Sequence, residues 1–443
     1  MTTRLRTVIR LRAAARVRTG EDGATRLVSP SGGQSFGVLT SGQRLLLDAV
    51  AERECDEQEL LAGAVEELPL AYALLAQLHR GNWLAATLLR DDRPVLTVVP
   101  AGRPTGTAAA VLGAAMGRND KGTSVLSRFA LVRRNGSRLV VESPRCGFAV
   151  EVDDPALLRL DDPVVVAVLA ECGLAVPELS EEDTDVALAQ WSPHELWFHA
   201  RTRQGRHDLP WGATRRFPAP PAHRAVRPGR VHRLPRPDPA AVAARDPRLT
   251  EVMETRRSVR EHDDAAPMTA TQLGEFLHRT ARTRSTVTRD GVELADRPHP
   301  SGGALHELEI YPVVGNVAGV PPGLHHYDPN LHHLTLVAAD SPVVRGIARG
   351  AAAAAGTAAR PQVLFVITAR FGRVMWKYES MGYALTLKNV GVLMSAMYLV
   401  ATAMNLAPCA LGGGDSDLFG RVAGLDYESE SSVGEFLLGT PAA

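Results

Sequence analysis

A dense run of prolines divides this chain and limits what it can fold into. The stretch FPAPPAHRAVRPGRVHRLPRPDPAAVAARDP, residues 217–247, contains eight prolines. Because proline fixes φ and lacks a backbone N–H donor, a segment of this composition cannot form a long helix or a central strand. The sequence therefore predicts an extended linker over residues 217–247, between an N-terminal region at 1–216 and a C-terminal domain at 248–443.

The composition is that of an ordinary globular protein, and its 443 residues allow two or three hydrophobic cores. Lys plus Arg and Asp plus Glu each number 49, so the net charge predicts neither a nucleic acid nor a membrane surface as partner. The basic N-terminus lacks the apolar core of a signal peptide. The longest apolar run, residues 390–404, is short for a membrane span and indicates a buried helix.

The cysteines indicate the cellular compartment. The four cysteines lie far apart in the sequence, at Cys55, Cys146, Cys172 and Cys409. They therefore form no CxxC pair and have no zinc-binding spacing. Scattered thiols of this kind are typical of a reducing environment. We therefore expect a cytoplasmic protein without a nucleic-acid or membrane partner.

The N-terminal region, residues 1–216, alternates short strands with apolar helical patches. Asn135 and Gly136 stand between two alternating runs, which is a strong indication of a two-residue hairpin turn. Helices followed by such a two-stranded wing predict one or two winged-helix-like units.

The C-terminal domain begins with helical sequence. Residues 269–283 repeat apolar side chains at helical spacing behind a cap at Thr269 or Thr271. Alternating and apolar runs predict strands, at residues 307–315, 331–337, 362–371 and 433–439. This pattern predicts an α+β fold with helices around a mixed sheet.

The motif RRSVR, at residues 256–260, is the first candidate functional motif of the C-terminal domain. It places three guanidinium groups and a hydroxyl within five positions, namely Arg256, Arg257, Ser258 and Arg260. Arginine binds phosphate bidentately and keeps its charge at working pH, so the motif predicts a phosphate site. A solvated basic helix face is the alternative interpretation.

Two glycine-rich stretches indicate a flat ligand. RPHPSGGALHELEIY contains the sequence Pro300, Ser301, Gly302 and Gly303, and PCALGGGDSDLFG contains Gly412 and Gly413. Glycines let a ligand approach the backbone closely, whereas a simple Pro-Gly turn is the alternative for the first stretch. There is no GxGxxG after a strand and no GxxxxGK[ST], so neither a dinucleotide-binding fold nor a P-loop is predicted.

Two histidine pairs are compatible with a metal site, His325–His326 and His332–His333. No carboxylate or cysteine completes a ligand set at the right spacing. We expect these histidines to lie along two strands joined by a turn at 328–330, and we predict no metal.

Lys377 and Tyr378 place a proton acceptor beside a proton donor just before the long apolar run. On an edge strand, neighbouring side chains would simply point in opposite directions. The chemical alternative is a catalytic pair, because a lysine can act as a base where burial or nearby positive charge lowers its pKa.

The order of these motifs resembles a known family. RRS-x-R, RPxPSGG with an LEIY strand, GLHHYDP, the Lys-Tyr pair and GGGDSDLF are similar to SagB-type and cyanobactin-oxidase-type azoline dehydrogenases of the nitroreductase-like superfamily. The similarity covers residues 248–441, and the stretches SVLSRFALVRRNGSRLVVESP and WSPHELWFHARTRQGRHDLPWGATRRF extend it upstream. These flavoenzymes oxidise thiazoline or oxazoline rings in ribosomally made peptides to thiazoles or oxazoles.

The resemblance implies an FMN at a homodimer interface. The RRSVR residues would hold the phosphate, ribityl chain and ring edge, residues 300–303 would lie against the isoalloxazine, and Gly412 and Gly413 would add backbone contacts. The helix at 390–403 would be the dimer element, with Ser395 where the family pattern leads us to expect Gln. A precursor peptide and a cyclodehydratase complex would be the partners, docked by the N-terminal region.

On this resemblance Lys377 and Tyr378 assist proton removal while a hydride equivalent passes to FMN N5. Two alternative functions are also compatible with the sequence. One is a nitroreductase-like reductase that takes hydride from NAD(P)H, and the other is a non-catalytic scaffold that presents peptide.

Overall fold

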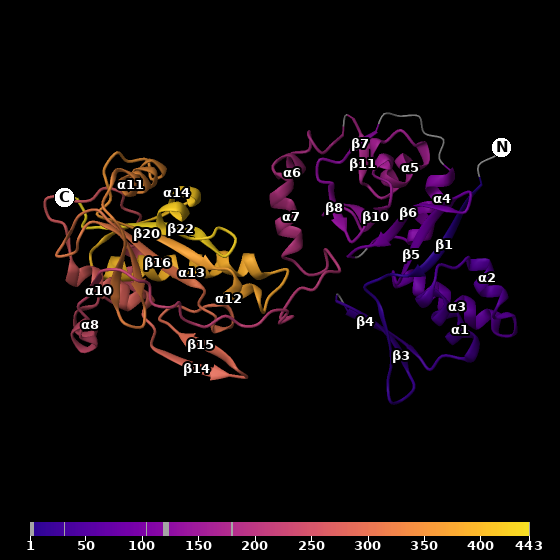
Figure 1. The fold of residues 1–443 in the computed structure, drawn as a ribbon, viewed down its shortest axis with the longest axis horizontal. Coiled ribbons are helices and arrows are strands. Elements are labelled where there is room, and N and C mark those ends of the chain that lie inside the picture. The colour runs from indigo at the N-terminus through magenta and orange to yellow at the C-terminus, as the bar shows by residue number, and fades with distance from the viewer. Residues whose placement is uncertain (1–3, 31, 103, 118–123, 179, 443) are drawn as a thin grey trace. The chain divides into compact units, whose positions relative to one another are not determined.

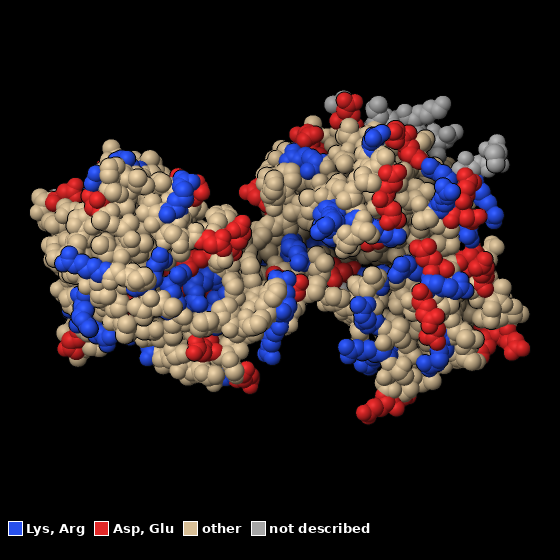
Figure 2. Space-filling model, viewed as in Figure 1, with Lys and Arg blue, Asp and Glu red and all other residues tan. Residues whose placement is uncertain are grey.

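The computed structural model describes residues 4–30, 32–102, 104–117, 124–178 and 180–442. The chain forms two compact units, Met1–Trp211 and Gly212–Ala443 (Figure 1). Each unit combines helices with a large sheet, which confirms the predicted α+β class. Figure 2 shows Lys and Arg side chains close to Asp and Glu side chains on the visible face of each unit, in keeping with their equal numbers.

The first unit is built on an antiparallel sheet of six strands. Its strands are β1 (Leu5–Leu11), β2 (Arg16–Thr19), β3 (Thr25–Ser29), β4 (Gly32–Gly37), β5 (Leu84–Arg90), β6 (Arg93–Pro100), β7 (Ser124–Leu126), β8 (Leu131–Asn135), β9 (Arg138–Glu142), β10 (Phe148–Val152) and β11 (Ala175–Pro177). Its α-helices are α1 (Ser41–Glu52), α2 (Glu57–Ala62), α3 (Leu68–Arg80), α4 (Ala108–Gly117), α5 (Pro163–Glu171), α6 (Val186–Ala189) and α7 (Pro193–Arg201). The large sheet has the order β1-β5-β6-β10-β9-β8, while β2-β3-β4 and β7-β11 form separate small sheets.

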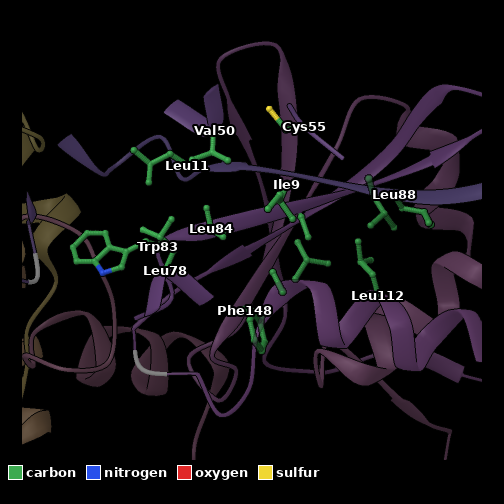
Figure 3. Close-up of a cluster of buried hydrophobic side chains, with 14 of the residues drawn as sticks. Ile9, Leu11, Val50, Cys55, Leu78, Trp83, Leu84, Leu88, Leu112 and Phe148 are labelled. Atoms are coloured by element: carbon green, nitrogen blue, oxygen red, sulfur yellow. The ribbon is translucent and has the colours of Figure 1, made fainter. Parts of the chain in front are cut away.

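One hydrophobic core joins the sheet and helices of this unit. Ile9 of β1 and Leu112 of α4 are fully buried in it, together with Leu78 of α3 (Figure 3). The predicted hairpin is confirmed, because Asn135 of β8 pairs with Arg138 of β9 across a two-residue turn. Gly136 takes φ +63° in that turn, a conformation that glycine adopts without strain.

The second unit surrounds a sheet of seven strands. Its strands are β12 (Val231–Arg233), β13 (Met268–Thr269), β14 (Ser285–Arg289), β15 (Val292–Asp296), β16 (Leu308–Val314), β17 (Val317–Ala318), β18 (Gly323–Asp328), β19 (His333–Ala339), β20 (Val363–Arg370), β21 (Ala407–Leu411) and β22 (Glu430–Gly439). Its α-helices are α8 (Pro239–Arg245), α9 (Leu249–Thr255), α10 (Ala270–Ala281), α11 (Pro342–Ala354), α12 (Gly372–Met375), α13 (Gly382–Ala403) and α14 (Ser416–Ala423). The sheet order is β12-β19-β18-β16-β20-β22-β21.

The seven-stranded sheet is covered on both faces because its strands are apolar on both sides. In β16, Ile310 packs in the cluster with α10 and α13, and the next residue, Tyr311, packs in the cluster with α11 and α14. Figure 1 shows these two pairs of helices on either side of the sheet. The predicted Thr269 cap of α10 is confirmed by a capping box with Gln272.

Strand direction differs from the prediction of a mixed sheet. Each described pairing within the seven-stranded sheet is antiparallel, and the parallel pairing in this unit joins β13 to β17. Short connections such as the turn between β18 and β19 allow antiparallel pairing, whereas parallel neighbours need a long crossover.

The proline-rich segment 217–247, predicted as an extended linker, lies within the second unit and contains ordered structure. Its β12 pairs with β19 at the edge of the large sheet, and its α8 follows an Asp238 cap with Pro239 at the first turn. An edge strand and a helix start are positions where proline is tolerated.

Three of the paired histidines, His325, His326 and His333, lie on β18 and β19 as expected, while His332 lies in the turn before β19. His326 shares a hydrogen bond with Glu309 at 2.9 Å, and His332 shares one with Tyr327 at 2.9 Å. His325 contacts the Pro321 carbonyl at 2.9 Å. Within the described parts of the chain, no three His, Cys, Asp or Glu side chains gather in a metal-binding group.

Helix α13 is longer and more exposed than the predicted buried helix at 390–404. It has 22 residues, is long and apolar enough to cross a membrane by length and composition, and has only 33% of its apolar window buried. A core helix passes the same test, and Leu393 and Met397 lie fully inside the core cluster with β16 and β20.

Candidate active site

Lys377 and Tyr378 lie in the turn between α12 and α13. Both side chains are half-buried, and the Lys377 Nζ lies 5.1 Å from the centre of the Tyr378 ring. An added Cβ at Gly303 would be 2.8 Å from Tyr378 Oη and 3.1 Å from Lys377 Nζ. The two side chains therefore converge on one point, and the alternative in which they point in opposite directions is wrong.

The loop that carries Gly303 has an unusual backbone. Gly303 takes φ +66°, and the non-glycine residues Ala304 and His306 take φ +56° and +48°. Positive φ is costly for residues with a Cβ and persists where the surroundings enforce it, often at functional sites. Glycine at 303 avoids two costs, the strain of a side chain at φ +66° and the displacement of the Tyr378 hydroxyl by an added Cβ.

A buried polar network holds this loop against α13. Asn389 Oδ1 accepts from the Gly302 N–H at 3.1 Å, and Asn389 Nδ2 donates to Glu307 Oε1 at 2.8 Å and to Ser301 Oγ at 3.2 Å. Burial raises the pKa of the Glu307 carboxyl, and the hydrogen bonds from Asn389 and Ser301 act against that rise. Asn389 and Glu307 lie outside the motifs from which the sequence predicts the site, although a lone Asn in an apolar helix is a usable sign.

The residues of RRSVR form a second group. They follow the end of α9 at Thr255, so the alternative of a basic helix face is wrong. Ser258 Oγ lies 2.7 Å from Tyr398 Oη of α13, and the Arg256 guanidinium stacks 5.2 Å from the centre of the Tyr398 ring. Arg256, Arg257 and Arg260 are exposed and form no ion pair with described residues, so their charges remain available for an anion.

Gly412 and Gly413 lie beside a cavity of about 380 Å³ on the same side of α13 as Ser258. The cavity is also lined by Leu387 and Gly391 of α13 and by Glu435. No atom lies within 4 Å of a Cβ added at either loop glycine, so a flat ligand can approach this backbone. Together with the free arginines, this open glycine loop fits a flat anionic cofactor such as FMN.

The two groups lie on opposite sides of α13. Asn389, which holds the Gly302–Gly303 loop, and Tyr398, which contacts Ser258, are nine residues apart, or about 2.5 helical turns. On the Tyr398 side the helix shows an exposed face that includes Leu387, Gly391 and Ser395, the position where Gln was expected. One chain therefore does not gather the predicted cofactor residues into a single site.

A wider cavity of about 660 Å³ adjoins the Lys377–Tyr378 turn. It is lined by Trp376, the residue before Lys377, by apolar side chains that include Phe217 and Phe371, and by charged side chains that include Arg224 and Glu428. This cavity gives the turn a neighbouring space of the size that ligand sites have.

Two family models match different units of the chain. The nitroreductase family model matches residues 253–440, and the cyanobactin oxidase ThcOx model matches residues 160–208. A protein named as a nitroreductase from Methanocaldococcus jannaschii is 30% identical over 165 residues, which cover 37% of this chain and 78% of that protein. The trifolitoxin-processing protein TfxB from Rhizobium leguminosarum bv. trifolii is 28% identical over 142 residues, which cover 31% of this chain and 38% of TfxB.

Solved structures show similarity at low scores. A nitroreductase from Ralstonia eutropha JMP134 aligns at a TM-score of 0.39 with 23% identity, over 53% of this chain and all of that chain. The Escherichia coli microcin synthetase McbBCD complex with truncated pro-MccB17 aligns at a TM-score of 0.36 with 20% identity, over 41% of this chain and 67% of that chain. The sequence matches confirm the predicted relation to nitroreductases and to cyanobactin oxidases. The chain belongs to the nitroreductase family of oxidoreductases, and it carries a cyanobactin-oxidase segment ahead of the family domain.

Proposed function

We propose that this chain oxidises thiazoline or oxazoline rings in a ribosomally made precursor peptide to thiazoles or oxazoles. The observation that carries the proposal is the convergence of Lys377 and Tyr378 on Gly303, in the loop predicted to face the flavin. The matches to the cyanobactin oxidase model and to a trifolitoxin-processing protein support a peptide substrate.

Aromatisation of an azoline removes two hydrogens from neighbouring ring carbons. Bound FMN supplies the acceptor for the hydride equivalent at N5. Lys377 Nζ takes the other hydrogen as a proton, and Tyr378 Oη orients the ring or relays that proton. The cavity beside Trp376, lined by both aromatic and charged side chains, gives the flanking peptide a place to lie beside the turn.

The cofactor is held by residues from two chains in this proposal. Arg256, Arg257, Ser258 and Arg260 would hold the phosphate and ribityl chain, Gly412 and Gly413 would contribute backbone beside the ring, and Pro300, Ser301, Gly302 and Gly303 of the other copy would complete the site. Two copies that pair through the exposed face of α13 bring together groups that a single chain keeps on opposite sides of that helix. This geometry supports a homodimer.

The N-terminal region would dock the leader peptide or a cyclodehydratase partner. We propose that it contains winged-helix-like units, since α1, α2 and α3 follow the small β2-β3-β4 sheet and lead into the β5–β6 hairpin, which pairs with β1. Strand β4 lies at the edge of its three-stranded sheet, and an extended peptide can add to such an edge through backbone hydrogen bonds.

The test is azoline oxidation by Lys377→Arg. Arginine keeps much of the length but stays protonated in a protein, so it cannot take up the ring proton. We expect the variant to purify yellow with FMN and to lose the removal of two hydrogens per ring, measured by mass spectrometry on an azoline peptide. Unchanged turnover in this variant contradicts the role of Lys377.

The same preparation separates the rivals. Family membership favours an NAD(P)H-dependent reductase as the second candidate, which predicts rapid flavin bleaching by NADPH and no azoline turnover. A colourless wild-type protein would instead indicate a peptide-presenting scaffold.

A further inference from the structure

The segment Gly212–Ala222, which we call the strap, runs along the Lys377–Tyr378 turn. Thr214 N–H donates to the Lys377 carbonyl at 2.8 Å, and Glu379 N–H donates to the Gly212 carbonyl at 3.2 Å. Ala213 and Tyr378 form an isolated antiparallel bridge between these two bonds. The backbone of the Lys-Tyr pair is thus paired with the strap as in a minimal sheet.

A side-chain contact reinforces this pairing. Arg216 and Glu379 form an ion pair at 3.2 Å, in which the arginine is 40% exposed and the glutamate 18% exposed. The Arg216 guanidinium also stacks 5.0 Å from the centre of the Phe217 ring. The ion pair and the backbone hydrogen bonds therefore both hold residues 377–379 against the strap.

The proline end of the strap is held through its carbonyl groups. Pro218, Pro220 and Pro221 have no N–H to donate, so this end cannot continue a regular ladder. Arg370 donates to the Pro221 carbonyl at 2.9 Å and to the Ala222 carbonyl at 3.2 Å. Arg373 donates to the Pro220 carbonyl at 2.6 Å.

Arg373 also joins the strap to the loop that carries Gly303. Its guanidinium is fully buried, and its Nε donates to the Leu305 carbonyl at 3.0 Å while Nη2 bonds to the Glu293 carbonyl. Burial lowers the pKa of Arg373 to about 10, so the group stays charged at neutral pH. One side chain four residues before Lys377 thus fixes the strap, the β15 strand and the loop that Lys377 and Tyr378 contact.

We propose that the strap positions Lys377 and Tyr378 against the Gly303 loop, with Arg216 and Arg373 as positioning residues. A base and the carbon it deprotonates must be held at a set distance, and a shift of about 1 Å can cost about 100-fold in rate. The inference rests on the proposed function for its rate measurement but not for its structural measurement.

Arg216→Ala tests the strap, and Arg215→Ala is the matched control. Arg215 is the neighbouring arginine, and its exposed side chain forms no ion pair with described residues, while its backbone N–H, 3.3 Å from the Lys377 carbonyl, is kept in the alanine variant. We expect Arg216→Ala to speed hydrogen exchange of the Glu379 amide and to lower kcat for azoline oxidation by up to about fivefold, as fits an ion pair of this exposure. FMN content and the KM for peptide should stay the same.

Two further variants keep the test sharp. The charge swap Arg216→Glu with Glu379→Arg should restore kcat and the protection of the Glu379 amide, which a general loss of folding would not do. Thr214→Pro removes the closer of the two backbone donors to the Lys377 carbonyl, the other being the Arg215 N–H at 3.3 Å, and should lower kcat by about 100-fold with FMN bound.

The outcomes separate this inference from the proposed function. Equal exchange at Glu379 in the Arg215→Ala and Arg216→Ala variants, or a swap that restores nothing, overturns the positioning role. A wild-type protein without azoline turnover overturns the proposed function, and the exchange difference between the two variants then decides the strap alone.

Discussion

The two groups of residues on either side of α13 differ in how firmly contacts within the chain fix their positions. The Gly303 loop is fixed by Asn389 and Glu307, by positive φ angles, and by contact with Tyr378. The RRSVR segment is exposed, and its arginines carry charges that no described acidic residue neutralises.

This difference fits two separate tasks. A rigid loop suits chemistry, because a proton transfer depends on exact placement of donor and acceptor. Free arginines suit capture of an anion, although each side chain loses up to about 2 kcal/mol of rotamer entropy when it becomes ordered. Substitutions on one side should therefore change turnover, and substitutions on the other side should change cofactor affinity.

The largest effect should come from the fixed side. In Gly303→Ala the added Cβ meets Tyr378 Oη at 2.8 Å in a backbone with φ +66°. We expect azoline oxidation, measured at saturating FMN because Gly303 is also proposed to contact the cofactor, to fall by about 100-fold. Gly291→Ala is the matched control, because Gly291 has φ +74° at a hairpin tip and no atom within 4 Å. Similar losses in both variants would mean that backbone strain, and not the contact with Tyr378, explains the effect.

A smaller effect should come from the exposed side. Arg257→Gln removes one charged donor from the phosphate site, and we expect the Kd for FMN to rise by about tenfold, which corresponds to about 1.4 kcal/mol. Turnover at saturating FMN should be nearly unchanged. Fluorescence titration of the apoprotein measures the Kd. Arg248→Gln, at an exposed arginine before α9, should leave it unchanged, and an equal rise there would point to general electrostatics.

The smallest effect should be a pH dependence of stability on the fixed side. Burial lowers the pKa of His299 to about 4 and that of His306 to about 2, from an ordinary value of 6.5. Below pH 6.5 the unfolded chain binds protons that the folded loop does not, so the free energy of unfolding falls as pH falls.

From pH 7 to pH 5.5 we expect a loss of about 1 kcal/mol for each of these histidines, measured by denaturant unfolding of the full chain. His306→Asn keeps a residue that tolerates positive φ and removes one titrating group, so it should flatten the slope. A slope identical to that of the wild type would contradict a neutral buried His306.

Features set by neighbouring residues were predictable from the sequence. The Gly136 turn and the Thr269 cap depend on local backbone chemistry, and the structure contains both. The adjacency of Lys377 and Tyr378 is visible in the sequence, and their catalytic role rests on resemblance. The convergence of both side chains on Gly303 is visible only in the folded structure.

Features set by distant contacts were not predictable in this way. Arg373 bonds to carbonyl groups 68 and 153 positions away in the sequence, and no periodicity records such a contact. The proline-rich stretch was assigned as a linker because its missing N–H groups exclude a ladder, whereas its carbonyl groups were free to accept from Arg370 and Arg373. The residue types of a segment show which backbone N–H donors it has. The tertiary structure decides which side-chain donors its carbonyl groups meet.

The nine-residue offset between Asn389 and Tyr398 has a genetic consequence if two chains share each cofactor. A mixed pair of one Lys377→Arg chain and one chain with all three RRSVR arginines replaced contains one site with both defects and one site with neither. Co-expression of two inactive alleles should then restore azoline oxidation, as intragenic complementation. Sites contained within single chains would stay inactive in every mixture.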